Sequence, residues 1–299
     1  MGSYAEPSFV YLLGLGVGHS IAPPVHNYIA SSLGCPWTFE ARDCTSVEGA
    51  VALMRHPTFA GAVITMPYKK SIMPYLDEVD NLAAKLGACN LVSILPGGRL
   101  RGTNTDWIGV AACLSEASSP GEHRPSLIIG AGGACKASLY ALTAVLKSKT
   151  IYILNRDEDE VLELEKEVKS KYTDVELVHV KDPEQAKTLS PPFHVVGTIP
   201  DAEPVSLNEK QVHRSLEVFL QSEQKGIVLD MCYKPRRTRI LRLSEQHGWK
   251  SIEGTAIIGH QFKEQYRLWC GEDLVKRLPL AGAWDVLHKV AESSAAINY

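Results

Sequence analysis

The chain has 299 residues, of which 45% are apolar and 22% charged, and its formal net charge is −3. That length suits two domains, and the composition is typical of a soluble globular protein. The small net charge gives no electrostatic reason to expect binding to nucleic acid or to an acidic membrane.

Cysteine usage and the first residues indicate where the chain works. The seven cysteines are odd in number and include no C-x-x-C pair, which is typical of a reducing compartment. Residues 1–7 lack the basic and apolar regions of a secretory signal, and no apolar stretch is long enough to span a membrane. We therefore expect a cytoplasmic protein. The sequence leaves open whether it is a monomer or a homodimer.

The first half of the chain alternates buried apolar runs with segments of helical character. The pattern predicts strands at 10–15, 61–65 and 90–95, and helices at 24–33, 77–86 and 107–117.

The second half continues the same alternation. It predicts strands at 127–129, 150–154, 175–180, 195–197 and 226–231, helices at 134–146 and 159–172, and loops at 117–125 and 198–204. The last stretch, 254–299, is mostly helical, and we expect it to fold back onto the N-terminal half. Such alternation is typical of a doubly wound parallel sheet, so the predicted fold class is α/β.

A lysine and an aspartate occupy short, specific settings in the first half. Lys69 ends the run Thr65-Met66-Pro67-Tyr68-Lys69, and Asp106 ends Gly102-Thr103-Asn104-Thr105-Asp106. Beside a dinucleotide, such a pair can move the proton when a carbonyl is reduced or an alcohol is oxidised. Lys69 is the better candidate for the proton carrier, because a desolvated lysine gives up its proton more readily, but either residue can fill that role.

A glycine-rich loop follows the strand at 127–129 and opens a helix. It reads Gly130-Ala131-Gly132-Gly133-Ala134, in the context that a dinucleotide fingerprint requires. Glycine lets the backbone approach a pyrophosphate, and the helix N-terminus offers N–H groups to it. Cys135 stands where the third glycine of G-x-G-x-x-G is expected, so a tight structural turn is the alternative. The strand–helix context favours the nucleotide.

Asn155-Arg156-Asp157 ends the next strand, where the adenosine ribose of a dinucleotide is expected. Arg156 can hold a 2′-phosphate or stack on adenine. The acids from Asp157 to Glu160 repel a phosphate and suit a free 2′-hydroxyl, although acids also favour helix N-termini for structural reasons. We therefore predict NAD as the cofactor, with NADP as the alternative, and no metal.

Ser20 lies near the expected start of a helix. Its hydroxyl can bind a carboxylate or cap the helix, and the segment alone does not decide between the two. His19 and His26, in the same segment, are expected to be core or surface residues rather than catalysts.

Taken together, the motifs resemble those of the shikimate/quinate dehydrogenase family over nearly the whole chain. The shared motifs are His19-Ser20-x-x-Pro23-x-x-His26-Asn27, Thr65-x-Pro67-x-Lys69, Gly87-Ala88-Cys89-Asn90, Asn104-Thr105-Asp106, the glycine loop with Asn155-Arg156, Asp230-x-x-Tyr233-x-Pro235-x-x-Thr238, and Gly254 through Gln261 to Trp269-Cys270-Gly271. The resemblance implies an α/β substrate-binding domain, 1–106 with 262–299, and an inserted Rossmann-like dinucleotide-binding domain, 107–261.

The resemblance also implies roles for single residues. Lys69 and Asp106 match the catalytic pair, and Asn90 matches a residue that holds ring hydroxyls. The other substrate contacts are Ser20, Thr65, Tyr233 and Gln261, and Gln265 lies one helical turn after Gln261. Gly254 and Ile257 stand where the family places backbone and an apolar side chain against the nicotinamide.

Three departures from the family pattern bear on specificity. Ala22 replaces a second hydroxyl near Ser20, which removes a donor to the substrate carboxylate and leaves space near ring carbon 1, where quinate carries a hydroxyl. Asp157 replaces a threonine of NADP-using members. Gly197-Thr198-Ile199-Pro200 replaces an Asn-Ala-Thr-Pro segment, so the cofactor contact of Thr198 is less secure.

These features predict a dehydrogenase that interconverts shikimate or quinate with the 3-dehydro ketone by hydride transfer to a nicotinamide cofactor. The rival hypothesis is a non-catalytic domain that senses quinate or shikimate on the same fold. The intact Lys69–Asp106 pair argues against this rival.

Overall fold

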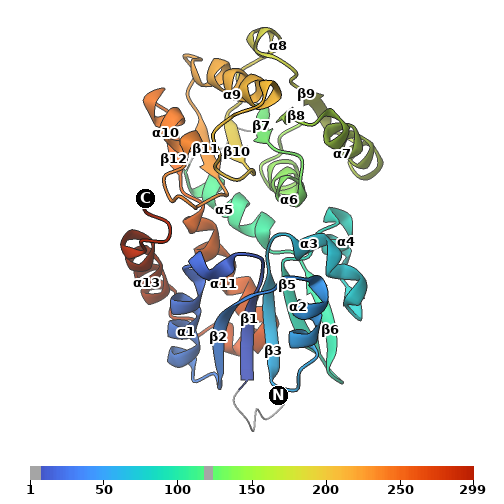
Figure 1. Ribbon diagram of the computed structural model, residues 1–299, viewed down its shortest axis with the longest axis vertical. Coiled ribbons are helices and arrows are strands. Elements are labelled where there is room, and N and C mark those ends of the chain that lie inside the picture. Colours follow the sequence, from blue (N-terminus) through green and yellow to red (C-terminus); the bar gives the residue numbers. More distant parts are fainter. Residues whose placement is uncertain (1–7, 118–123) are drawn as a thin grey trace. The chain divides into compact units, whose positions relative to one another are not determined.

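The computed structural model describes residues 8–117 and 124–299, which divide into two compact units (Figure 1). Unit 1 joins the N-terminal part up to Thr105 with Ile258–Ile297, and unit 2 comprises Asp106–Ile257 and the last two residues. The C-terminal helices therefore do fold back onto the N-terminal half. The units differ from the predicted domains at both boundaries: Asp106, predicted in the substrate-binding domain, belongs to unit 2, whereas 258–261, predicted in the dinucleotide-binding domain, belong to unit 1. Residues 1–7, in which we expected no secretory signal, and most of the predicted loop at 117–125 lie outside the described residues.

Unit 1 is built on a mixed sheet with the strand order β2-β1-β3-β5-β6-β4. Its strands are β1 (Ser8–Gly14), β2 (Trp37–Asp43), β3 (Phe59–Ile64), β4 (Glu78–Val79), β5 (Leu91–Leu95) and β6 (Arg99–Thr103). β1 runs parallel to β2 and β3, whereas β5 is antiparallel to β3 and β6. The ends of β3 and β6 and the start of β5 consequently share one edge of the sheet.

Helices cover both faces of this sheet. They are α1 (Ala22–Leu33), α2 (Val47–Met54), α3 (Tyr68–Ser71), α4 (Asn81–Leu86), the main part of α11 (Thr255–Cys270), α12 (Glu272–Val275) and α13 (Leu280–Ser293), with 3-10 turns η1 (Val17–His19) and η2 (Met73–Tyr75). Tyr11 and Leu13 of β1 pack with Met54 of α2 in the core of one face. On the other face, Trp269 of α11 donates a hydrogen bond to the carbonyl of Val92 at 3.1 Å.

The predicted helix at 77–86 is wrong in its first part. Glu78–Val79 forms β4, which pairs with β6, and α4 begins only at Asn81. Asp80 explains the helix start, because its side chain accepts a hydrogen bond from the N–H of Ala83 at 2.7 Å.

Unit 2 contains the predicted doubly wound parallel sheet, in the order β12-β11-β10-β7-β8-β9. Its strands are β7 (Ser126–Ile129), β8 (Thr150–Leu154), β9 (Glu176–His179), β10 (His194–Gly197), β11 (Ile227–Asp230) and β12 (Lys250–Ile252). Its helices are α5 (Asp106–Ala117), α6 (Gly133–Tyr140), continued by a π-helical turn, η3 (Ala141–Val145), α7 (Glu158–Lys171), α8 (Pro183–Thr188), α9 (Leu207–Leu220) and α10 (Arg239–Gln246).

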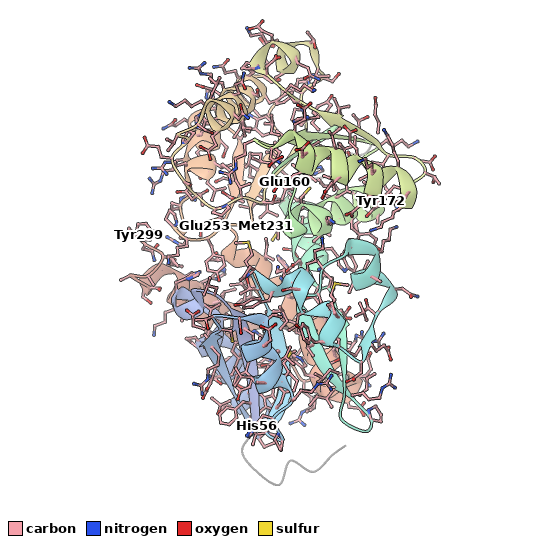
Figure 2. The ribbon with its side chains drawn as sticks, turned by 45° about the vertical axis from the view of Figure 1, so that its right-hand side comes forward. His56, Glu160, Tyr172, Met231, Glu253 and Tyr299 are labelled. Atoms are coloured by element: carbon pink, nitrogen blue, oxygen red, sulfur yellow. The ribbon has the colours of Figure 1, made fainter. Side chains whose placement is uncertain are left out.

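Alternate strand residues of unit 2 face two separate helical layers. Ile128 and Ile153 pack with α5, α6 and α7, whereas Leu127 and Tyr152 pack with α8, α9 and α10. Figure 2 labels Glu160, in the first turn of α7, and Tyr172, the C-cap residue that follows the helix. The strand order reverses between the parallel strands β7 and β10, and in such sheets ligands bind at the carboxyl ends of the strands beside that point.

Across the described ranges, no helix combines the length and the apolar character that crossing a membrane requires.

Candidate active site

Three predicted motifs meet at one edge of the unit 1 sheet through their backbones. The N–H of Ile64 donates to the carbonyl of Asn90 at 2.8 Å, and the N–H of Asn90 donates to the carbonyl of Thr103 at 3.0 Å. The carbonyl of Lys69 accepts from the N–H of Cys89 at 2.7 Å. The turn that carries Thr65 and Lys69 is therefore held beside Asn90 and beside the strand that leads to Asp106.

A buried network of polar side chains covers this edge. Thr105 donates to Gln261 at 2.7 Å, and Asn90 donates to Gln261 at 3.2 Å and to the Thr105 hydroxyl at 3.1 Å. The backbone N–H of Thr105 donates to Asn90 at 2.6 Å. These bonds bring α11 against β5 and the end of β6.

Gln265 extends the network and contributes a side-chain oxygen that could accept a further hydrogen bond. Its Nε2 donates to Gln261 Oε1 at 3.2 Å, whereas its own Oε1 is buried and has no hydrogen-bond partner among the described residues. A buried acceptor without a partner costs free energy unless a ligand supplies a donor. A ring hydroxyl is a donor of the required kind.

Thr105 is a member of this network that the sequence analysis missed as a site residue. It lies inside the Asn104-Thr105-Asp106 motif, so its position carried a signal, but its partner Gln261 is distant in sequence. The residue is 1% exposed, and its hydroxyl links the end of β6 to α11.

Ser20 and Ala22 form a small turn at the start of α1. The Ser20 hydroxyl oxygen accepts from the N–H of Ala22 at 3.2 Å, and the N-cap residue of α1 is Ile21, so Ser20 is not the helix cap. Accepting that bond leaves the hydroxyl proton available to donate to a carboxylate. The N–H of Leu15 donates to the carbonyl of Met66 at 3.0 Å, which holds this loop beside the Thr65 turn.

The two histidines of this segment differ in their surroundings. His26 is buried and stacks on Phe39, with 4.2 Å between the ring centroids. Burial lowers the pKa of His26 to about 3, so its ring is neutral. His19 bonds through Nδ1 to the carbonyl of Gly16 at 2.8 Å.

The two predicted catalytic residues lie on helices of different units. Lys69 belongs to α3 in unit 1 and is partly buried. Asp106 is the first residue of α5 and is 5% exposed. At a helix N-terminus, the backbone N–H dipoles stabilise a carboxylate.

The glycine loop of unit 2 is held tightly against its sheet. Gly130 has a φ of 109°, and its N–H donates to the carbonyl of Leu154 at 2.8 Å. A Cβ at Gly130 would lie 2.5 Å from the hydroxyl of Thr198, which itself donates to Ile129 at 2.7 Å. Both the backbone conformation and the close approach therefore require glycine at this position.

The loop from Gly130 to Ala134 fits the pyrophosphate of a nicotinamide dinucleotide. Gly132 is the N-cap of α6 and offers no side-chain cap, and a Cβ built there would meet no atom within 4 Å. The first N–H groups of α6 are thus accessible to an anion. Cys135 is fully buried in the core, as expected of a small residue that lets the helix approach the strand.

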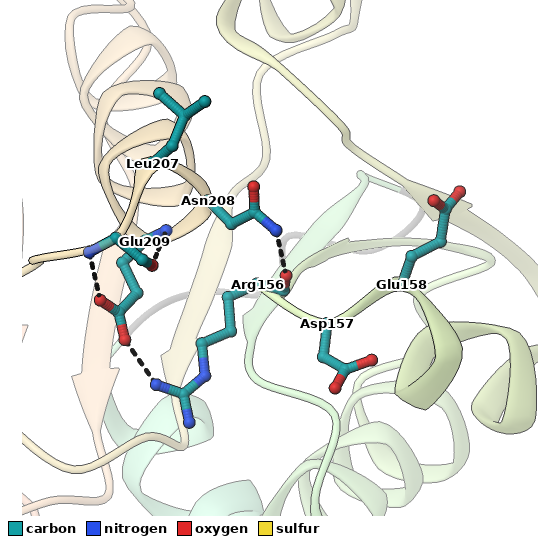
Figure 3. Close-up of a pocket in the computed structure, with 7 residues that line it drawn as sticks. Arg156, Asp157, Glu158, Leu207, Asn208 and Glu209 are labelled. Carbon is teal, nitrogen blue, oxygen red and sulfur yellow. Dashed lines mark hydrogen bonds and ion pairs between the residues drawn. The ribbon is translucent and has the colours of Figure 1, made fainter.

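A cavity of about 610 Å³ opens beside the end of β8 (Figure 3). Arg156, Asp157 and Glu158 line one side, and Ser206–Glu209 line the other. Asp157 also caps α7, because it accepts hydrogen bonds from the N–H groups of Asp159 at 3.0 Å and Glu160 at 3.2 Å. The structural interpretation of Asp157 is therefore correct, and it is compatible with a role at the ribose.

Asn155 and the start of α9 complete this corner. The amide of Asn155 donates to the carbonyl of Asp157 and to Glu160, both at 2.9 Å. Asn208 and Glu209 were missed by the sequence analysis, because about fifty residues separate them from Arg156. The capping box Ser206-x-x-Glu209 was the available signal for this helix start.

The loop that carries Tyr233 is tied to the end of β11 in unit 2. Buried Asp230 accepts from the Thr238 hydroxyl at 2.6 Å and from the N–H of Cys232 at 3.1 Å. Burial raises the pKa of Asp230 to about 6. Gly254 lies beside the same residue, since a Cβ there would be 2.6 Å from the Asp230 carbonyl oxygen.

Ile257 is 5% exposed and lies in the core of unit 2 against Gly109. Its apolar side chain thus has a packing role in addition to the nicotinamide contact that the sequence analysis assigned to it. Among the residues that the structure describes, no group of three or more His, Cys, Asp or Glu side chains is arranged to hold a metal ion.

A doubly wound sheet with a pyrophosphate-fitting loop, together with a second α/β unit that carries a polar, lysine-containing edge, defines the class of nicotinamide-dependent oxidoreductases. A family model described as the shikimate dehydrogenase substrate binding domain matches residues 12–92. The chain is 36% identical over 290 residues to a quinate dehydrogenase of Emericella nidulans, and the alignment covers 89% of this chain and 88% of the relative. The chain therefore belongs to the shikimate/quinate dehydrogenase family.

Solved structures agree with this assignment. The shikimate 5-dehydrogenase of Thermus thermophilus, in complex with NADP(H) and shikimate, matches with a TM-score of 0.75 and 28% identity over 94% of this chain and 99% of that chain. The quinate dehydrogenase of Corynebacterium glutamicum, in complex with NAD, shares the fold with a TM-score of 0.75 and 22% identity over 95% of this chain and 100% of that chain. The predicted family and fold class are confirmed, and the dehydrogenase interpretation is supported over the sensing alternative.

Proposed function

We propose that this chain oxidises the 3-hydroxyl of quinate and of shikimate, and reduces the corresponding ketone, with NAD as the preferred cofactor. Unit 1 binds the substrate, and unit 2 binds the dinucleotide. One observation carries the proposal: hydrogen bonds hold the Lys69 turn beside Asn90 and beside the strand that leads through Thr105 to Asp106. Those are the segments that would surround a hydroxyl-rich ring. The identity with a quinate dehydrogenase supports the same substrate class.

The residues of this chain would divide the work of the reaction. A bound nicotinamide would supply the hydride acceptor for the ring carbon that bears the 3-hydroxyl, and its reduced form the hydride donor in the reverse direction. Lys69 Nζ takes the hydroxyl proton in oxidation and returns it in reduction. Asp106 accepts from a neighbouring ring hydroxyl, orients Lys69 and offsets its charge. The reverse assignment, with Asp106 as the proton carrier, leaves the same residues in place.

The remaining polar groups would fix the orientation of the substrate by hydrogen bonds. Asn90, Gln261 and Gln265 bond to the ring hydroxyls, and Gln265 brings an acceptor that needs a donor. Ser20 donates to the carboxylate, with Thr65 and Tyr233 as further contacts. Ala22 leaves the space that the additional hydroxyl of quinate occupies, so both acids are accepted.

Charge at the ribose corner favours NAD. Three carboxylates, Asp157, Glu158 and Glu209, line the cavity with one arginine, Arg156. A 2′-phosphate would bring a further charge of about −1.5 to −2 into this setting. Asn155 and Arg156 would contact the adenosine, and the loop from Gly130 to Ala134 would hold the pyrophosphate. Thr198, Gly254 and Ile257 would lie toward the nicotinamide.

Initial rates with shikimate and with quinate, each with NAD and with NADP, test this function. We expect both acids to be oxidised and NAD to give the larger kcat/KM. Thermal stabilisation by either acid without formation of reduced nucleotide would identify a sensor instead. A tenfold preference for NADP would refute the charge argument, and Arg156→Ala should then abolish that preference.

A further inference from the structure

The cavity beside β8 is bordered by a second element, the start of α9, which no sequence motif linked to the cofactor. Figure 3 shows Glu209 of α9 pointing toward the guanidinium of Arg156. Arg156 Nη1 donates to Glu209 Oε1 at 2.5 Å, and Asn208 Nδ2 donates to the Arg156 carbonyl oxygen at 3.0 Å. The arginine is thus held at its side chain and at its backbone by consecutive residues of one helix.

The helix fixes the carboxylate that holds the arginine. Glu209 Oε2 accepts from the N–H groups of Ser206 at 2.9 Å and Val205 at 3.0 Å, and the Glu209 N–H donates back to the Ser206 hydroxyl at 3.2 Å. One carboxylate oxygen therefore completes a capping box while the other faces Arg156. The backbone N–H of Ser206 and then the Arg156 guanidinium lower the pKa of Glu209 to about 2, so it stays ionised.

The ion pair between Glu209 and Arg156 adds little to stability. The Arg156 side chain is 67% exposed and that of Glu209 is 26% exposed, and an ion pair that exposed contributes little to folding. A capping box also accepts glutamine in place of glutamate. Glutamine at this position would therefore keep the capping bonds but lose the ion pair with Arg156.

We propose that Glu209 is a specificity-determining residue that withholds Arg156 from the 2′-phosphate of NADP and so selects NAD; this inference rests on the proposed function of the cavity. A 2′-phosphate is recognised by an arginine that can turn to it. Here it would have to displace Glu209 and then lie beside that carboxylate and Asp157. Glu158 contributes less repulsion, because it pairs with Lys181. A free 2′-hydroxyl instead finds an acceptor in the same carboxylates.

The test substitutes Glu209→Gln, which keeps the cap but removes the charge. Titration calorimetry would measure the affinities for adenosine 2′,5′-bisphosphate and adenosine 5′-monophosphate, which differ only in the 2′-phosphate. We expect the ratio of bisphosphate to monophosphate affinity to rise about tenfold, because Arg156 could then form a charge-assisted hydrogen bond with the 2′-phosphate. The ratio of kcat/KM for NADP to that for NAD should rise in parallel.

Two further variants isolate the role of Arg156. Glu158→Gln removes the same charge from the same cavity but leaves the Arg156–Glu209 pair, and should change the affinity ratio by less than about threefold. In the double variant Arg156→Ala with Glu209→Gln, the gain should disappear. An equal gain in Glu158→Gln, or a gain that survives in the double variant, overturns the role of Glu209.

The outcomes also separate this inference from the function on which it rests. If the wild type binds the monophosphate and oxidises substrate, but Glu209→Gln leaves the affinity ratio within about twofold, the inference is wrong and the function stands. If the wild type binds neither nucleotide and shows no turnover, both are wrong.

Discussion

Ala22 is the residue at which this chain departs most directly from the expected carboxylate site. Its N–H donates to the Ser20 hydroxyl oxygen, and its side chain is buried at the first turn of α1. A methyl group cannot donate to a carboxylate, and it discriminates weakly among ligands. Substrate choice should therefore respond to this single position.

We expect Ala22→Ser to lower the KM for shikimate by a few-fold to about tenfold, the scale of one hydrogen bond. The added hydroxyl also fills the space that quinate needs, so the KM for quinate should rise. Steady-state kinetics with both acids on both proteins provides the measurement. A variant that gains quinate activity and loses shikimate activity would show that the carboxylate is held elsewhere.

Asp230 should make stability depend on pH in an unusual direction. Its folded pKa of about 6, raised by burial and by Asp201, lies above the unfolded value of about 3.9. The folded state then binds more protons between these values, so this residue stabilises the protein below about pH 4 and that stability is lost as pH rises through about 6.

Asp230→Asn removes this dependence while keeping a side chain that can accept from the N–H of Cys232. Urea unfolding at several pH values should show the wild type losing on the order of 2 to 3 kcal/mol relative to the variant between about pH 4 and 6, at about 1.4 kcal/mol for each pKa unit. Parallel pH curves for the two proteins would show that Asp230 does not titrate in this range.

Residues whose roles depend on distant partners could not be assigned from the sequence. Lys69, Asp106 and the glycine loop stand in motifs whose chemistry can be recognised locally. Thr105 and Glu209 act through Gln261 and Arg156, which lie far along the chain. Each of these residues comes within hydrogen-bond distance of its partner only after the sheets have formed.

At the scale of elements, α5 packs closely on the start of α11 within unit 2. A Cβ at Gly109 would lie 2.5 Å from Ile257 Cγ2 and 2.9 Å from its carbonyl oxygen. A side chain can rotate away from such a contact, but a helix backbone cannot. Glycine is therefore needed in the interior of α5 despite its low helix propensity.

Gly109→Ala should lower the free energy of unfolding by about 1 to 3 kcal/mol, the cost of overpacking a well-packed site, even though alanine favours helix. The control is Gly49→Ala in α2, where the added Cβ would meet only the Ser46 hydroxyl at 3.6 Å. That change should be neutral or stabilising by up to about 1 kcal/mol. Urea denaturation of both variants checks the contrast, and equal effects would refute the packing role of Gly109.

Elements with strong local patterns were predicted well, and short or polar ones were not. Residues 127–129 of β7 and 151–154 of β8 are continuous apolar runs, as buried parallel strands should be. β4 has two residues and exists because β6 pairs with it, which no local pattern specifies. β2 ends in Glu40, Arg42 and Asp43 at the edge of its sheet, and the amphipathic α9 was also left unassigned.

For the whole molecule, the sequence predicted two α/β parts with a C-terminal return to the first. The exact division needed the structure, because α11 continues through residues 257 and 258, where the units divide. Gln261 lies just past that division and bonds within unit 1. A helix that crosses a domain boundary leaves no break in the sequence pattern.

The central claim is that Lys69 takes part in the chemistry, and turnover of Lys69→Ala with quinate and NAD tests it most directly. The adjacent Lys70, which is exposed in the same short helix, provides a matched control as Lys70→Ala. We expect kcat to fall about 10²-fold or more in Lys69→Ala, and likewise in Asp106→Asn, with unchanged folding, and to stay within about twofold in Lys70→Ala. Near-wild-type turnover in folded Lys69→Ala would contradict the proposed mechanism.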